Sequence, residues 1–381
     1  MELHSDRADP CILPLCDETL KHLARYLPGS VRKALTILIR SGFGIAALAV
    51  GIVAGFILYR TPSQTARLGE QAYRLYSNGN AKGAIDVYSE QIRLHPDDYI
   101  LYLRRGLSQK HAGAIEAAVT DFDEALRRIP RPMSAAELGP RVFNSGLAET
   151  HIHNMAVELH TERAEALQTI GQVDAAMEDL DAAIALTARP TIVQRRATLR
   201  LLTGQFDGAR SDFDTVLDRG IDADAIFGRG LARYMAADWA GATLDLQRAL
   251  RLKPRSGVYA LWLLKAQLRA RQPVPLDEFK GIPENNPAWA WINAFLGDYD
   301  GGSLVNGLRS AAAGDPARTC ETTYLLGDWF LIKNTPDEAA TAFRAAADTC
   351  PQLTMPRVAA TVELKRLEAP TPARSTGSAG R

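Results

Sequence analysis

Residues 99–130 read YILYLRRGLSQKHAGAIEAAVTDFDEALRRIP, and this stretch decides the fold because its pattern recurs along most of the chain. Counted from Tyr99, it has glycine at positions 8 and 15, alanine at positions 20 and 27, phenylalanine at position 24 and proline at position 32. Further copies, several of them spaced by 33 or 34 residues, place a small residue at position 8: Ala72, Ala164, Ala197, Gly230 and Gly327. The chain is therefore expected to consist of repeats of one structural unit.

The residue types in this unit indicate a pair of antiparallel helices. Small side chains at positions 8 and 20 allow two helices to approach closely, and the aromatic residue at position 24 fills the space above them. Glycine at position 15 tolerates the left-handed backbone at the C-terminus of a helix, and proline at position 32 stops the second helix. No stretch alternates cleanly enough to predict a strand.

The unit resembles the tetratricopeptide repeat, a helix–turn–helix of about 34 residues that stacks into a right-handed superhelix. The resemblance covers residues 61–366 with six copies in phase, and it implies an all-α solenoid. Residues 131–156 are expected to be an insertion. Residues 257–366 are expected to form a C-terminal cap, in which four prolines interrupt the pattern: Pro273, Pro275, Pro283 and Pro287. Residues 286–316 (NPAWAWINAFLGDYDGGSLVNGLRSAAAGDP) and 320–334 (CETTYLLGDWFLIKN) resemble the caps of bacterial envelope adaptor proteins with this repeat.

An apolar stretch precedes the repeats. Nineteen residues without a charge, SGFGIAALAVGIVAGFILY, lie between Arg40 and Arg60, and about 20 apolar residues cross a bilayer as a helix. The sequence thus predicts one transmembrane helix over residues 35–60 after a short cytoplasmic tail, residues 1–34, with a cleaved signal peptide as the alternative. A modest excess of Lys and Arg before the span favours a single-pass protein of the inner (cytoplasmic) membrane, with a cytoplasmic N-terminus and periplasmic repeats.

Both ends of the chain carry weaker signals. Ala47, Gly51 and Gly55 are four residues apart within the span, a spacing that permits a homodimer through close helix–helix contact. Residues 367–381 are rich in Pro, Ser, Gly and Ala, which predicts a disordered tail.

Composition and motifs argue against several classes of function. The formal net charge is zero and the charged residues are interspersed, so nucleic acid is not an expected partner. No phosphate loop, dinucleotide fingerprint, nucleophile elbow or HExxH motif occurs, so neither an enzyme nor a cofactor is expected. No metal site is expected either, since His151, His153 and His160 include no pair spaced by four residues.

The resemblance implies a protein or peptide partner in the concave groove, contacted from repeat positions 2, 5, 9 and 12. Carried over residue by residue, the groove contains Tyr73, Tyr76, Leu103, Leu107, Lys110, Gln194, Thr198, Leu201, Phe227, Leu231, Tyr234, Tyr324 and Asp328. This surface is expected to be apolar and aromatic, and it lacks the carboxylate clamp of chaperone-binding members, which favours a hydrophobic or helical ligand. The expected function is a membrane-anchored scaffold or adaptor in the bacterial envelope. The alternative is a self-associating structural scaffold without a separate ligand.

Two further kinds of residue pair follow the repeat. Arg at position 7 and Asp at position 23 recur in four copies: Arg105 with Asp121, Arg163 with Asp179, Arg196 with Asp212, and Arg229 with Asp245. A recurring slot favours structural ion pairs that keep helices in register over a ligand-binding stripe. In the last copy, Cys320 at position 1 and Cys350 at position 31 are expected to lie close enough for a disulfide, because the two helices run antiparallel. Two buried free thiols are the alternative.

Overall fold

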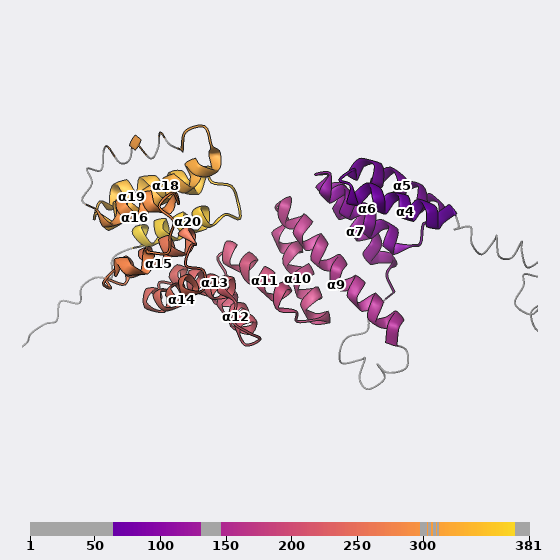
Figure 1. The fold of residues 1–381 in the computed structure, drawn as a ribbon, viewed down its shortest axis with the longest axis horizontal. Helices are drawn as coiled ribbons and strands as arrows, with labels where there is room; N and C mark the ends of the chain where they lie inside the picture. Colours follow the sequence, from indigo (N-terminus) through magenta and orange to yellow (C-terminus); the bar gives the residue numbers. More distant parts are fainter. Residues whose placement is uncertain are drawn as a thin grey trace, which may run out of the picture. The chain divides into compact units, whose positions relative to one another are not determined.

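The computed structural model describes residues 64–130, 146–297, 303, 306, 307, 310 and 312–369. Within these ranges it contains fifteen named α-helices, one 3₁₀ turn and no strand (Figure 1). The predicted span over residues 35–60, its Ala47, Gly51 and Gly55, and the tail over residues 1–34 lie outside the described residues. No helix of the described ranges is both long and apolar enough to cross a bilayer.

The chain divides into two compact units, residues 1–79 and 80–381. In the first unit the described part is helix α4 (Gln64–Ser77), the first helix of the first predicted repeat. The second unit continues with α5 (Ala81–Leu94), α6 (Tyr99–His111), α7 (Ile115–Arg128), α9 (Gly146–Thr169), α10 (Val173–Leu186), α11 (Pro190–Leu202), α12 (Phe206–Leu217), α13 (Ala223–Met235), α14 (Trp239–Leu252), α15 (Gly257–Arg269), η2 (Leu276–Phe279), α16 (Ala288–Leu296), α18 (Pro316–Ile332), α19 (Pro336–Thr349) and α20 (Met355–Glu368).

The contacts between these helices are those of stacked hairpins. From α5 to α20, each named α-helix packs against the next one along the chain. In addition, the first helices of neighbouring repeats are in contact: α11 contacts α13, and α13 contacts α15. The second unit is therefore an all-α solenoid in which the first helices share one side.

The residues that carry the repeat pattern pack as the sequence predicts. A Cβ built on Gly106 at position 8 would lie 2.7 Å from the ring of Phe122 at position 24. The same addition at Gly327 would lie 2.5 Å from the ring of Phe343. Both rings are completely buried. The prediction that small residues at position 8 admit an aromatic side chain at position 24 is confirmed.

Position 15 adopts the left-handed backbone conformation in every repeat that the structure describes there. Four of these residues are glycines, with φ between 77° and 82°: Gly79, Gly113, Gly171 and Gly204. The remaining three are Ala237 (φ 64°), Arg271 (φ 53°) and Asn334 (φ 60°). Arg271 shows that the repeat continues through α15, within the range 257–366 that the sequence assigns to the C-terminal cap. The four prolines interrupt the second helix of this repeat, where η2 and α16 replace a full-length helix.

Two predicted boundaries differ from the structure. Residues 146–156 of the expected insertion are the start of α9, a continuous helix of 24 residues that includes the first helix of the third repeat. Ala156 is already 1% exposed and belongs to the packed interior. At the other end α20 extends to Glu368, so the first residues of the expected tail are helical. Residues 131–145 and 370–381 lie outside the described part.

All four predicted Arg–Asp pairs are present, and each is bidentate. Arg229 donates from Nε to Asp245 Oδ2 (2.9 Å) and from Nη2 to Oδ1 (2.7 Å), while its Nη1 reaches Asp214 Oδ1 of the preceding repeat (2.7 Å). The equivalent groups are Arg105 with Asp121 and Ser89, Arg163 with Asp179 and Asp123, and Arg196 with Asp212 and Asp181. Each arginine thus joins the two helices of its own repeat and also the previous repeat. The predicted structural role is confirmed.

Helix α20 contacts helices far earlier in the chain. Arg366 Nη2 donates to the backbone oxygens of Tyr234 (3.2 Å) and Met235 (2.6 Å), at the C-terminus of α13. Glu363, 1% exposed, forms ion pairs with Arg269 of α15 (Nη1–Oε2 3.1 Å) and with Arg366. The helices from α13 to α20 consequently share one hydrophobic core.

Candidate functional site

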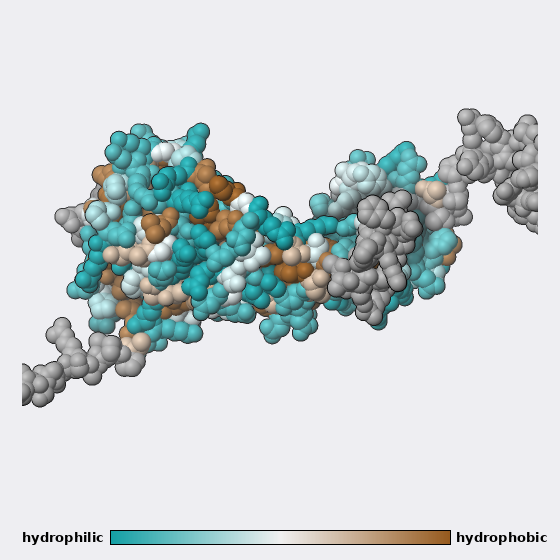
Figure 2. All heavy atoms as spheres, turned by 90° about the horizontal axis from the view of Figure 1, so that it is seen from below, coloured by the Kyte–Doolittle hydropathy of each residue, from teal (hydrophilic) through white to brown (hydrophobic). Residues whose placement is uncertain are grey.

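Some large hydrophobic side chains of the second unit are exposed. Several large ones lie between residues 221 and 276: Ile221 (72% exposed), Leu244 (66%), Val258 (56%) and Leu276 (63%). Figure 2 shows hydrophobic patches among hydrophilic side chains on the surface of the C-terminal helices. Of these residues, Val258 lies at a pocket.

The pocket has a volume of about 430 Å³ and is formed by α13, α15, α16, α18 and the start of α20. Apolar and aromatic side chains make most of its wall: Phe227, Leu231, Val258, Leu261, Trp262, Trp291, Tyr324, Leu325 and Met355. We call it the α13–α18 pocket. The ring of Phe227 stacks on Tyr259 with centroids 4.1 Å apart, which fixes its orientation. Glu321 is an exposed carboxylate that also lines the pocket.

Helices α13, α15 and α18 supply the wall from equivalent repeat positions. Phe227 and Leu231 are positions 5 and 9 of the repeat that starts at residue 223, and Tyr324 is position 5 of the last repeat. Counting from Gly257 makes Val258, Leu261 and Lys265 positions 2, 5 and 9 of the intervening repeat. The sequence analysis missed these three residues because prolines mark the second half of that repeat. The signal that identifies them is the 34-residue step from Ala223 to Gly257.

A buried ion pair lies at the pocket. Lys265, 1% exposed, places Nζ 2.7 Å from Asp328 Oδ2 and also donates to the hydroxyl of Tyr324. The same Nζ lies 3.5 Å from the centroid of the Trp262 ring and 4.3 Å from that of Tyr324. Burial lowers the pKa of Lys265, and the carboxylate of Asp328 opposes this shift. The charge of Lys265 is therefore paired with Asp328 inside the protein, and a ligand in the pocket would contact mainly apolar side chains.

Tyr234 packs edge-on against Trp262, with ring centroids 5.3 Å apart. It is completely buried, and among the described residues its hydroxyl has no hydrogen-bond partner. Burial, with the carboxylates of Asp328 and Glu363, raises its pKa well above 10.0. Tyr234 thus belongs to the interior that supports the pocket.

A second, polar hollow lies between α9 and α11. This cleft of about 590 Å³ is lined by Thr161, Glu165, Gln168, Gln194, Arg195 and Thr198, among others. Glu165 pairs with Lys110 (3.0 Å) and Arg195 (2.9 Å). Burial would raise the pKa of Glu165, but the hydrogen bonds from these two cations outweigh it and hold the pKa below its ordinary value. This part of the surface is polar, whereas the sequence predicts an apolar and aromatic face along the whole groove.

The predicted groove residues differ in accessibility. Tyr73 and Thr198 are exposed; Tyr76, Leu107, Lys110, Gln194 and Phe227 are half-buried; Leu103, Leu201, Leu231, Tyr234, Tyr324 and Asp328 are buried. The structure brings Phe227, Leu231 and Tyr324 together in the α13–α18 pocket, and Gln194 and Thr198 in the polar cleft. Tyr234 and Asp328 present almost no surface.

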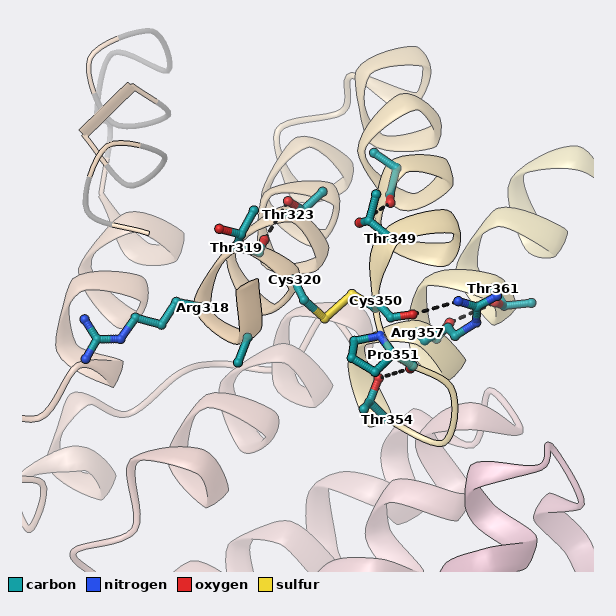
Figure 3. Close-up of a disulfide and its surroundings, with 12 residues drawn as sticks. Arg318, Thr319, Cys320, Thr323, Thr349, Cys350, Pro351, Thr354, Arg357 and Thr361 are labelled. Carbon is teal, nitrogen blue, oxygen red and sulfur yellow. Dashed lines mark hydrogen bonds between the residues drawn. A yellow bond between two sulfur atoms is a disulfide. The ribbon is translucent and has the colours of Figure 1, made fainter. Parts of the chain in front are cut away.

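Cys320 and Cys350 form a disulfide, with 2.10 Å between the sulfurs and 5.1 Å between the Cα atoms. Figure 3 shows that the bond joins α18 to the residue that follows α19. The backbone oxygen of Cys350 accepts a hydrogen bond from Arg357 Nη1 (2.7 Å), at the start of α20. The disulfide therefore fixes the last hairpin and the turn that leads into α20. Within the described ranges, no cluster of three or more His, Cys, Asp and Glu side chains is suited to a metal ion.

Two parts of the chain match a known repeat family. Residues 70–131 and 195–257 match the tetratricopeptide repeat family. No curated protein matches the chain. A tetratricopeptide-repeat protein from Parabacteroides merdae is 14% identical over 79% of this chain and 99% of its own, with a TM-score of 0.48. The C-terminal part of a repeat protein from Cytophaga hutchinsonii is 16% identical over 76% of this chain and 98% of its own, with a TM-score of 0.44.

Proposed function

Because the chain carries tetratricopeptide repeats, we propose that it is a protein–protein interaction scaffold that binds an apolar or helical segment of a partner protein in the α13–α18 pocket. The single observation that carries this proposal is the convergence of family contact positions from α13, α15 and α18 on one open apolar pocket. Phe227 is held by its stack on Tyr259 and Lys265 by its ion pair with Asp328. Lining side chains with fixed contacts lower the entropic cost of association.

The energetics favour a hydrophobic anchor. Burying one Leu- or Phe-sized side chain contributes about 1.5–3 kcal/mol, and a few such anchors dominate the affinity of most interfaces. Phe227, Leu231 and Trp262 supply the apolar surface for such an anchor. The polar cleft at Gln194 and Thr198 offers hydrogen bonds to a neighbouring part of the same ligand.

We further propose that the scaffold is held at the inner membrane by residues 35–60, with the repeats in the periplasm. The uncharged stretch of nineteen residues and the charge bias around it support the anchor. A disulfide between Cys320 and Cys350 suits an oxidising compartment. In this role the protein acts as an adaptor in the envelope and not as an enzyme.

Affinity capture from membranes tests the binding role. Phe227→Ala removes an aromatic wall of the pocket, and Leu244→Ala truncates an exposed leucine on α14 that does not line it. We expect Phe227→Ala to lose specific partners that the wild type and Leu244→Ala both retain. An identical set of partners in all three would contradict the proposal. Light scattering that detects only self-association, with no partner, would favour a structural scaffold instead.

A further inference from the structure

A larger cleft, of about 760 Å³, shares only helix α20 with the α13–α18 pocket and has no lining residue in common with it. One wall is α20 with the turn before it, and the other is the turn that joins α11 to α12. We call it the α20 cleft. Its apolar residues are Leu202, Phe206, Leu353, Val358 and Val362.

The charged residues of the α20 cleft have one sign. Arg357, Lys365 and Arg366 line it, and no carboxylate does so among the described residues. Arg357 donates to the backbone oxygen of Cys350 (2.7 Å), and no carboxylate of the described residues forms an ion pair with it. Arg366 shares the carboxylate of Glu363 with Arg269, so two guanidinium groups face one negative charge. Lys365 is exposed. The cleft therefore combines an apolar surface with an excess of positive charge.

The walls of the α20 cleft are held in place. Arg366 ties α20 to the C-terminus of α13 through the backbone oxygen of Met235 (2.6 Å). In the turn before α20, Leu353 has φ 55°, in the left-handed region. This conformation costs a residue with a side chain about 1–2 kcal/mol. The packing of Leu353 against the cluster that includes Ile192 and Leu199 offsets that cost. A cleft with fixed walls is preorganised for binding.

We propose that the α20 cleft is a docking site for an acidic amphipathic helix of a partner protein. The apolar side chains of the partner helix contact Phe206 and Val362, and the carboxylates of the partner helix face Lys365 and Arg357. Charge complementarity selects this occupant. Residues 370–381 of the chain itself carry Arg374 and Arg381 and no acidic residue, so their charge matches that of the cleft and disfavours them. A lipid surface is broad and flat, whereas the apolar residues line a recess.

Fluorescence anisotropy with a probe peptide tests the proposal on the full chain in detergent micelles. The probe is a labelled helix of about 18 residues, or five turns, with Leu on one face and Glu on the other. The control peptide has Lys in place of each Glu. We expect the acidic peptide to bind, with an affinity that falls as salt rises, and the basic peptide not to bind.

Variants of the protein locate the site. Lys365→Glu reverses one exposed charge at the α20 cleft and is expected to weaken the acidic peptide about fivefold, as for one rim charge pair. Lys82→Glu reverses an exposed charge on α5 and should leave the affinity unchanged. Val362→Asn tests the apolar contact and should also weaken binding, with circular dichroism as the check on folding.

Four outcomes would overturn the proposal. They are no binding of the acidic peptide, equal binding of both peptides, equal effects of the Lys365→Glu and Lys82→Glu variants, and an unchanged affinity in the Val362→Asn variant.

Two other occupants of the α20 cleft would be recognised by different measurements. Binding of anionic phosphatidylglycerol vesicles that Lys365→Glu abolishes, without binding of the peptide, would assign the cleft to a lipid surface. Self-association in sedimentation that Lys365→Glu abolishes, again without binding of the peptide, would assign it to a second copy of the chain. None of these results bears on the α13–α18 pocket.

Discussion

Lys265 and Asp328 form an ion pair in the interior, with 2.7 Å between Nζ and Oδ2 and side chains that are 1% and 3% exposed. Removal of one partner leaves an unpaired buried charge, so we expect Lys265→Met to lower the free energy of unfolding by about 3–5 kcal/mol. The double variant Lys265→Met, Asp328→Leu should recover most of this loss, because both charges are gone. Urea unfolding of the wild type, of Lys265→Met, of Asp328→Leu and of the double variant measures these losses. A double variant whose loss equals the sum of the single losses would show that the two residues are not coupled.

Tyr234 and Tyr324 offer a matched pair of hydroxyl deletions. The Tyr234 hydroxyl has no partner within the described ranges, so Tyr234→Phe should leave stability at pH 7 unchanged or raise it by up to about 1 kcal/mol. The Tyr324 hydroxyl accepts a hydrogen bond from Lys265, so Tyr324→Phe should lower stability by about 1–2 kcal/mol. Thermal unfolding distinguishes the two. A larger loss in Tyr234→Phe than in Tyr324→Phe would contradict the assigned contacts.

Tyr234 makes the stability of the protein depend on pH in the alkaline range. Burial raises the pKa of Tyr234 well above 10.0, so the folded state retains a proton that the unfolded state releases. The contribution of this group is complete below the unfolded pKa of about 10 and falls as pH rises further. We expect the loss of stability above pH 10 to be shallower in Tyr234→Phe than in the wild type. Identical slopes would show that other groups, such as Tyr324, account for the whole effect.

The repeat explains how much of the fold the sequence predicts. Gly106 and Phe122, or Gly327 and Phe343, are fixed by local spacing, so a period of 34 residues identifies their contact. Register is harder to see where side chains depart from the consensus. Arg271 occupies the left-handed position 15 in place of glycine, and the prolines beyond it conceal a repeat whose first helix is intact.

Accessibility of the groove could not be predicted in the same way. The contact positions of the repeat identify Phe227 and Leu231 as groove residues. They do not show whether a later helix covers other contact positions, such as Tyr234. Tyr234 is buried because α20 returns to the end of α13, and Arg366 bonds to Met235 across 131 residues. Such a contact is not periodic and leaves no local signal. Lys265 was likewise missed, since its partner Asp328 is two repeats away in sequence.

Ala237 permits a direct test of the position 15 geometry. Its φ of 64° lies in the left-handed region, which glycine adopts without steric cost. We expect Ala237→Gly to raise the free energy of unfolding by about 1 kcal/mol, the steric cost less the entropy that glycine loses. The control is Ala236→Gly, at a neighbouring residue with φ −84°, which should not stabilise. Equal effects of both substitutions on the unfolding midpoint would contradict a left-handed backbone at Ala237.

The disulfide predicts a redox-dependent stability. Cys320 and Cys350 are 30 residues apart, and closing such a loop contributes about 3–4 kcal/mol on the chain-entropy estimate. We expect reductant to lower the unfolding temperature of the wild type and to leave the Cys320→Ala, Cys350→Ala double variant unchanged. Peptide mapping after maleimide labelling of the denatured protein provides the second readout. Labelling of both cysteines before reduction would show that the bond does not form.

Site-specific photocrosslinking tests the proposed binding role of the α13–α18 pocket most directly. A photoreactive amino acid replaces Val258, which lines the pocket and is 56% exposed, or Leu244 on α14, which is 66% exposed and lies outside it. After irradiation of membranes that contain the full chain, we expect a discrete crosslinked partner from Val258 and none from Leu244. Phe227→Ala should remove that product. Equal products from both positions, or a product that persists in Phe227→Ala, would contradict partner binding in the pocket.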